Sequence, residues 1–427
     1  MSAIDDILDR VPLPRVVTIR QSFPRPRIDD VGSELLARVR ARGLLSGIRR
    51  GARIAIAAGS RGISNQPLMI SLLGQEIRRL GGEPFIVPAM GSHSGATAEG
   101  QRKMLLGLGI RDDIPIRSSM EVVRIGTSEN GLPVHVDRNA WEADGIVVIN
   151  RIKPHVAFRG PYESGLMKML AIGLGKQYGA EVCHNLGFGS MSANIPAIGK
   201  VVLASGKILM AIAVLENPYH ETCRIEVLAP AEVAQAEPPL QEESRRLLPR
   251  FYCDALDVLV IDEIGKNISG TGFDNNIVGR YHTPFASGGP TITRVAALDI
   301  TDESHGNANG LGILDFTTRR AFDKFDFEQT YPNSLTSTVP TSVKIPMVLK
   351  NDRQAIQAAV KTCNIARFED VRLARVRNTL SLDEIEVSEN VAEELSSNPS
   401  VAVVRAPYDL AFDGDGNLPV RGAAVVH

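Results

Sequence analysis

The chain has few of the side chains that mark several common kinds of protein. Its 427 residues include only four cysteines, which lie far apart and form no Cys-x-x-Cys pair. This usage fits free thiols in a reducing cytoplasm and argues against an iron–sulfur cluster or a structural zinc site. No apolar run approaches the length needed to span a bilayer, and the acidic N-terminus does not resemble a signal peptide. We therefore expect a cytoplasmic protein with no membrane partner.

The sequence also lacks the charge and motifs of several functional classes. The net charge is −2 and no basic run alternates with aromatic residues, so we expect no nucleic-acid partner. No Gly-x-Ser-x-Gly elbow occurs, and His220-Glu221 has no second histidine at the zincin spacing. Gly173-Leu-Gly-Lys-Gln177 lacks the glycine spacing and the Ser/Thr of a phosphate loop. These absences argue against an α/β-hydrolase, a zincin and a P-loop enzyme.

What the sequence does contain is an alternation of buried-strand and amphipathic-helix patterns, which predicts an α/β fold. Residues 53–58, 84–88 and 144–150 are short apolar runs typical of buried strands. Between the first two, apolar residues at helical spacing start near Pro67 and stop at Gly81-Gly82, which predicts a helix. Later patterns predict a strand from Asp257, a helix over 353–363 and a strand over 400–404.

A proline-rich stretch divides the chain into two predicted domains. Residues 229–239 read as a linker by composition. We therefore predict an N-terminal cofactor-binding and catalytic α/β domain over 1–240 and a C-terminal α/β domain over 241–427. Both should have mostly parallel sheets, with the active site in the cleft between them.

Three loops that follow predicted strands carry residues suited to ligand binding. They contain Arg61, His93 and His155. Ligands in open α/β sheets bind beyond the carboxyl ends of the strands, so these residues are plausible neighbours. Taken singly, His93 fits a solvated loop histidine, His155 a capping or core histidine, and Arg61 a surface guanidinium.

The segment from Pro154 to His184 combines two histidines with a lysine in an apolar run. Lys168 lies between two methionines, where an ammonium loses solvation. It is either a lysine that extends its amine to solvent or a reactive amine. His184 is either a helix histidine bonded to backbone or a metal ligand. Cys183 could be a ligand or nucleophile, although neighbours on a helix point in different directions.

Taken together, Gly-Ser-Arg at 59–61, Gly-Ser-His at 91–93, Pro154-His155, Lys168 and His184 resemble the lactate racemase family of nickel-pincer-nucleotide enzymes. The resemblance implies a pyridinium mononucleotide that binds nickel through sulfur, carbon and sulfur. It further implies covalent attachment at Lys168, nickel ligation by His184, acid–base roles for His93 and His155, and a carboxylate contact from Arg61. It also assigns cofactor binding to Gly59, Ser60 and Ser164.

In the second domain, the resemblance leaves Lys266 and Asn275 as candidates for substrate binding. The family's second-domain tryptophan has no counterpart, because the only tryptophan is Trp141. A larger or more polar hydroxy acid than lactate is therefore expected. The expected partners are this substrate and the cofactor-making enzymes. The alternatives are a different redox or elimination reaction with the same cofactor, and a non-catalytic small-molecule binding protein.

Overall fold

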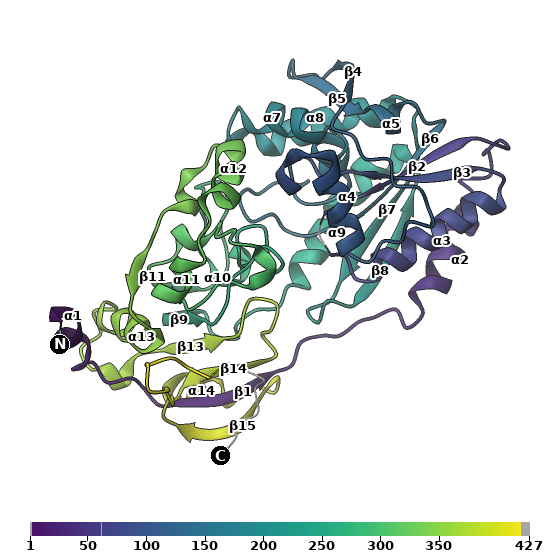
Figure 1. Cartoon of the computed structure of the whole chain (residues 1–427). Helices are drawn as coiled ribbons and strands as arrows, with labels where there is room; N and C mark the ends of the chain where they lie inside the picture. The colour runs from purple at the N-terminus through teal and green to yellow at the C-terminus, as the bar shows by residue number, and fades with distance from the viewer. Residues whose placement is uncertain (1, 61, 420–427) are drawn as a thin grey trace. The chain divides into compact units, whose positions relative to one another are not determined.

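The computed structural model describes residues 2–60 and 62–419, which form two compact units. Unit 2 comprises residues 24–248 and 336–338, and unit 1 comprises residues 1–23, 249–335 and 339–427 (Figure 1). The boundary predicted from the sequence lies at 240, with the N-terminal segment in the first domain. The structure differs because the strand formed by residues 16–21 pairs within unit 1.

Unit 2 is built on a five-stranded sheet in the order β3-β2-β6-β7-β8. The first three pairings are parallel and only β7–β8 is antiparallel, as predicted for a mostly parallel sheet. A separate hairpin pairs β4 with β5. The elements are α2 (Val31–Arg42), β2 (Arg53–Ala58), α3 (Gln66–Arg79), β3 (Glu83–Pro88), α4 (Ala98–Gly107), β4 (Val122–Thr127), β5 (Pro133–Asp137), α5 (Arg138–Trp141), β6 (Gly145–Arg151), α6 (Leu166–Lys168), the π-helical η2 (Met169–Gly173), α7 (Lys176–His184), α8 (Met191–Ala204), β7 (Ile208–Glu216), β8 (Thr222–Leu228) and α9 (Val233–Arg246).

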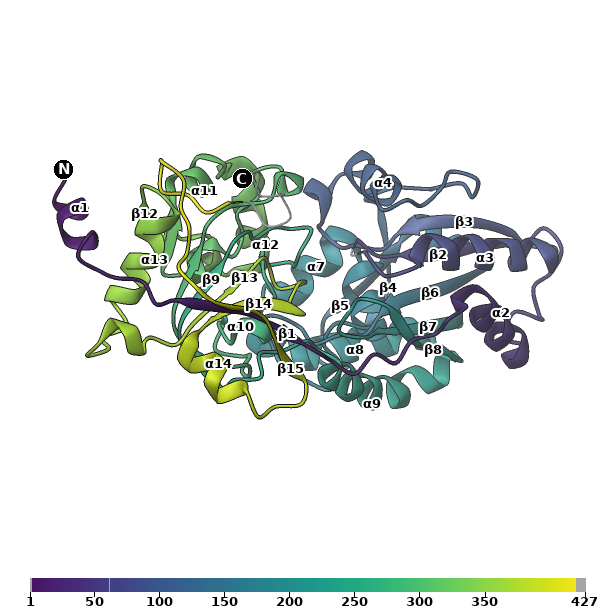
Figure 2. The same ribbon diagram turned by 90° about the horizontal axis from the view of Figure 1, so that it is seen from below.

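The central strands of the unit 2 sheet are mostly apolar because both faces of the sheet are covered. Alternate residues such as Ile54, Ile56 and Val147 pack against α2 and α3, which lie together on one side (Figure 2). Residues between them, such as Ala55 and Val148, are also fully buried. Burial on both faces is typical of parallel sheets, and it leaves the strand ends as the places for polar function.

Unit 1 contains an eight-stranded sheet in the order β12-β11-β10-β9-β13-β14-β1-β15. Strands β12 to β13 pair in parallel, whereas β14, β1 and β15 add an antiparallel part that Figure 2 shows side by side. The elements are α1 (Ala3–Leu8), β1 (Val16–Gln21), β9 (Ala255–Ile261), α10 (Asn275–Val278), β10 (Thr291–Ala297), β11 (Phe316–Thr318), α11 (Arg319–Asp323), α12 (Phe327–Ser337), β12 (Met347–Leu349), α13 (Asp352–Lys361), β13 (Leu373–Val376), β14 (Glu384–Ser388), α14 (Glu389–Leu395) and β15 (Val401–Tyr408).

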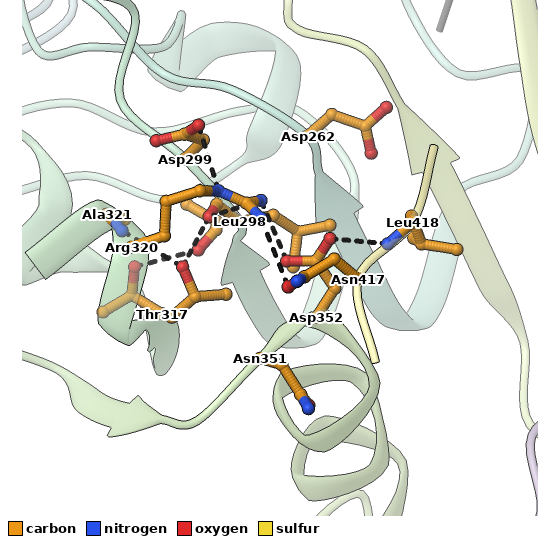
Figure 3. Close-up of polar contacts among 12 residues, drawn as sticks. Asp262, Leu298, Asp299, Thr317, Arg320, Ala321, Asn351, Asp352, Asn417 and Leu418 are labelled. Atoms are coloured by element: carbon orange, nitrogen blue, oxygen red, sulfur yellow. Dashed lines mark hydrogen bonds and ion pairs between the residues drawn. The ribbon is translucent and has the colours of Figure 1, made fainter. Parts of the chain in front are cut away.

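A polar cluster closes the carboxyl ends of β10 and β11 in unit 1 (Figure 3). Arg320 lies between two carboxylates, 3.1 Å from Asp299 and 3.0 Å from Asp352. Asp352 also accepts the Leu418 backbone N–H at 2.9 Å, and Arg320 bonds to Asn417. The charged groups of the cluster therefore pair with one another, and they hold the chain around Leu418 against the start of α13.

The predicted linker at 229–239 is wrong, because most of it is helical. A short turn at 230–232 leads into α9, which runs over fourteen residues with Pro238 and Pro239 inside it. Proline has no N–H to donate to the carbonyl four residues earlier. For Pro238 that carbonyl belongs to Ala234, and it accepts the Tyr162 hydroxyl at 2.6 Å instead. A contact from a distant residue thus replaces one of the helix's own hydrogen bonds.

Candidate functional site

The candidate site of unit 2 lies where β2, β3 and β6 end. These strands are neighbours and parallel, so the loops after them share one edge of the sheet. The first loop carries Gly59 and Ser60, the second carries His93, and the third carries His155. Arg61, the predicted carboxylate contact, lies outside the described residues.

The loops after β2 and β3 are joined directly by a side-chain hydrogen bond between Ser60 Oγ and His93 Nδ1. Each of these loops also packs against the stretch that contains Lys168. A Cβ added at Gly59 would lie 3.1 Å from the Met169 side chain. The Gly91 N–H donates to the Gly173 carbonyl at 3.3 Å, at the end of η2. The structure therefore places Ser60 and His93 beside the helical stretch 166–173.

A buried ion pair supports the loop that carries His93. Lys176 and Asp137 are both fully buried, with Nζ 3.1 Å from the carboxylate. Nζ also donates to the Pro88 carbonyl at 2.6 Å and to Gln101 Oε1 at 3.1 Å. Gln101 in turn donates to the Gly91 carbonyl at 2.9 Å and more weakly to that of His93. The Gly-Leu-Gly-Lys sequence at 173–176 is thus a structural element in this fold.

His155 occupies a loop closed at its neck by a two-residue bridge. The Lys153 N–H donates to the Ser164 carbonyl at 2.8 Å, and the Ser164 N–H returns the bond at 3.2 Å. Within the loop, the fully buried Glu163 accepts the His155 backbone N–H at 2.6 Å. The Ala157 N–H donates to His155 Nδ1 at 3.1 Å. This bond places the hydrogen of the neutral ring on Nε2.

Lys168 is half-buried at the point where α6 passes into η2. Such single-turn π-helical segments are frequent at functional sites. The Asn150 side chain fixes this region from β6 by donating to the Gly165 carbonyl at 2.9 Å. Burial has the larger effect on the pKa of Cys183 and of His184, and the Lys168 amine is close enough to favour the anionic thiolate and the neutral imidazole. Lys168 and His184 therefore share one neighbourhood.

His184 ends α7, and its ring contacts Phe188, as the ring of His155 also does. The ring centroids are 5.3 Å apart for His184–Phe188 and 6.1 Å apart for His155–Phe188. Burial, and to a smaller extent Lys168, lowers the pKa of His184 to about 4, so the imidazole is neutral at pH 7. Its Nδ1 is buried without a hydrogen-bond partner. Burial raises the pKa of the Cys183 thiol to about 12, so this thiol stays protonated and is a poor nucleophile.

Lys266 and Asn275 belong to unit 1, and their predicted substrate contacts stay predictions. Lys266 Nζ donates to the Gly270 carbonyl at 2.6 Å within its own loop. Asn275 is fully buried, where it accepts the Thr271 hydroxyl and donates to the Arg280 carbonyl at 2.6 Å. In this conformation both side chains make hydrogen bonds within the segment 266–280 that carries them.

Comparison with known proteins bears on unit 2 most directly. Residues 29–195 match the family model described as the lactate racemase N-terminal domain. This stretch is similar to a lactate racemase N-terminal domain. The match spans Ser60, His93, His155, Lys168 and His184, and it confirms the family resemblance predicted from the sequence.

The fold of the chain agrees with that of a solved lactate racemase. The apoprotein from Thermoanaerobacterium thermosaccharolyticum superposes with a TM-score of 0.52 at 13% sequence identity, covering 85% of this chain and 99% of that one. Curated protein sequences give no match. The predicted α/β class is confirmed, and the fold of the chain is similar to that of the solved lactate racemase.

Sequence reasoning missed the residues that hold the site together. Phe188, Glu163 and the Lys176–Asp137 pair have no distinctive local pattern, and each acts through contacts with distant residues. Within the described residues no helix is long and apolar enough to cross a membrane. The same residues also contain no group of three or more His, Cys, Asp or Glu side chains that could hold a metal ion.

Proposed function

We propose that this chain racemises or epimerises a 2-hydroxy acid with a nickel-pincer nucleotide attached to Lys168. The observation that carries the proposal is the assembly of Ser60–His93, His155–Phe188–His184 and Lys168 around one helical stretch at the carboxyl ends of the strands. The lactate racemase N-terminal domain over 29–195 supports the same reaction class.

The residues present fit this cofactor. His184 offers a neutral imidazole with a buried nitrogen that has no hydrogen-bond partner, which is the form that binds a metal. A single histidine suits a metal whose other ligands would come from the nucleotide, and imidazole is a donor that nickel accepts. Lys168 is half-buried beside His184. A nucleotide attached to Lys168 could therefore have its metal bound by His184 at the same time. When bound, the nucleotide would supply the hydride acceptor and donor.

The two histidines would move the proton of the substrate hydroxyl. Oxidation of a 2-hydroxy acid removes a hydride from Cα and a proton from oxygen, which leaves a planar α-keto acid. Return of the hydride to the other face and of the proton to oxygen gives the other configuration. His93, with Nδ1 bonded to a hydroxyl that can accept or donate, can present either a base or an acid.

His155 begins in a different state from His93. Its Nδ1 accepts the Ala157 N–H, so Nε2 carries the hydrogen and can donate to a substrate oxygen. To accept a proton at Nε2, the ring must move its own hydrogen to Nδ1 and give up the Ala157 bond. We therefore expect the two enantiomers of a racemised substrate to differ in kcat, with KM differing in the same proportion because the equilibrium constant is 1, since each uses a different histidine as its first base.

The proposal is tested with protein made alongside the cofactor-making enzymes. Intact mass should show a covalent increment that Lys168→Ala loses, and a panel of chiral hydroxy acids should reveal the substrate. In deuterated water the α-hydrogen should be retained, since a hydride returns to carbon without exchange. Deuterium at the α-carbon, or an increment retained in Lys168→Ala, would contradict the mechanism. Loss of the hydroxyl group instead would favour the elimination alternative.

A further inference from the structure

Helix α9 is bonded at several points to the segment that carries His155 and Lys168. The Ser244 hydroxyl donates to the Ile152 carbonyl at 2.8 Å, and Arg245 pairs with the buried Glu163. Toward its start, the Ala234 carbonyl accepts the Tyr162 hydroxyl at 2.6 Å. The helix therefore holds the loop from its beginning at β6 to its end at α6.

Glu237 makes the contact of α9 nearest to Lys168. Its Oε2 accepts the Met167 N–H at 2.8 Å, and the neighbouring Leu166 amide also favours the charged carboxylate. These are the first two amides of α6, whose own N-cap residue, Gly165, has no side chain to bond them. A negative charge at this position also interacts favourably with the helix dipole. Glu237 thus supplies from a distant helix the cap that α6 lacks.

Placing a carboxylate at this position lowers the stability of the fold. Glu237 is fully buried, and its second oxygen, Oε1, has no hydrogen-bond partner. Gly165 is packed so closely that an added Cβ would lie 2.1 Å from Oε1. Burial raises the pKa of Glu237 to about 7, although the amides of Met167 and Leu166 oppose this shift. Residues that lower stability without an obvious packing benefit are typical of functional regions.

We propose that Glu237 is a positioning residue, which orients the Lys168 amine for attachment of the nucleotide by fixing the first turn of its helix. The inference rests on the proposed function, since it concerns how Lys168 meets that cofactor. Lys168 directly follows Met167, so a loosened first turn would move the Lys168 backbone as well as its side chain. To fix the first turn of α6, the side chain at position 237 must be as long as glutamate and must carry an oxygen that accepts the Met167 N–H. A negative charge on a shorter side chain is not enough.

The test compares three substitutions at Glu237 in the full chain made with the cofactor-making enzymes. Glu237→Gln keeps an acceptor at the same reach, Glu237→Asp keeps the charge but shortens the reach, and Glu237→Leu removes the acceptor. Attachment, followed by intact mass, should be near parental for the glutamine variant. It should fall at least about tenfold for the other two, as a displacement near 1 Å can cause. Hydrogen exchange should show the amides of 166–173 losing protection only in these two variants.

Gln241→Leu is the matched control, because Gln241 is one turn further along α9 and fully buried, with neither amide atom hydrogen-bonded. This variant should attach the nucleotide to the same extent as the parent. Equal loading by Glu237→Leu and the parent would overturn the inference, as would an aspartate variant that loads better than glutamine. If the leucine variant does not fold, the aspartate–glutamine comparison decides. A parent chain with no mass increment would instead refute the proposed function.

Discussion

Replacing Lys176 with methionine should destabilise unit 2 by about 3–5 kcal/mol, the usual result of removing one partner from a buried ion pair. The ammonium is fully buried, forms an ion pair with Asp137 at 3.1 Å, and donates to the Pro88 carbonyl at 2.6 Å and to Gln101 Oε1 at 3.1 Å. Methionine keeps the apolar stem but leaves the carboxylate without its counter-ion and the two neutral acceptors without this donor. The uncompensated carboxylate contributes most, and each neutral acceptor adds roughly 1 kcal/mol or more.

Burial already raises the pKa of Asp137 and lowers that of Lys176, and the attraction between them offsets only part of each shift. Adding Asp137→Asn to Lys176→Met removes the orphaned charge, so the double variant should be more stable than the single one by about 1–3 kcal/mol. A non-additive result of this sign separates a charge effect from a simple loss of packing.

The assay is urea unfolding followed by the fluorescence of Trp141, the only tryptophan, which lies in α5 of unit 2. Lys200→Met is the control, because Lys200 pairs with Glu129 at 3.2 Å while more than half of each side chain is exposed; it should cause no measurable change. A loss below about 1 kcal/mol for Lys176→Met, or a double variant less stable than the single one, would refute the reasoning.

Three further changes test other contacts. Glu76, whose pKa is lowered to about 2 by two arginines, should lose about 1–2 kcal/mol of stability on conversion to glutamine at pH 7; the difference should shrink as pH falls from 4.5 toward 2 in acid titrations. Glu237→Gln should have the same free energy of unfolding as the parent near pH 4.5 and be roughly 1–3 kcal/mol more stable at pH 8. The reason is that a carboxyl group whose pKa is raised by folding lowers the stability of the parent as pH rises from 4.5 to 7. Equal melting temperatures at pH 8 would contradict this. Ser60→Ala should lower kcat about tenfold with little change in KM, since it removes the hydroxyl that orients His93; an unchanged kcat in steady-state assays would show the contact to be incidental.

The strand ends could be predicted because their signals are local. The apolar runs before Gly59, Gly91 and Arg151 have the length and bounds of buried strands, and parallel strands bring their carboxyl ends to one edge. The same local signals are enough to predict that Ser60, His93 and His155 lie on loops that follow strands. The predicted roles of these residues in catalysis are a separate matter and stay predictions.

What the sequence did not reveal depends on contacts between distant residues. Pro238-Pro239 indicates a break in a helix, yet α9 continues through both, and the distant Tyr162 hydroxyl bonds the Ala234 carbonyl that Pro238 leaves without a helix donor. Phe188 reads as an ordinary core aromatic, yet its ring neighbours both His155 and His184. Periodicity cannot show such pairings, because nothing in the local pattern encodes which distant side chain will be the partner.

Strand β1 has a consequence for how the protein is made. Translation delivers β1 before unit 2, whereas its neighbours β14 and β15 follow that unit in the chain. Residues 24–248, nearly all of unit 2, emerge in the interval and can fold as a contiguous stretch. Until β14 and β15 are made, β1 has both edges open to other chains, which makes this interval vulnerable to aggregation. A strand that is made before unit 2 is therefore paired only after it.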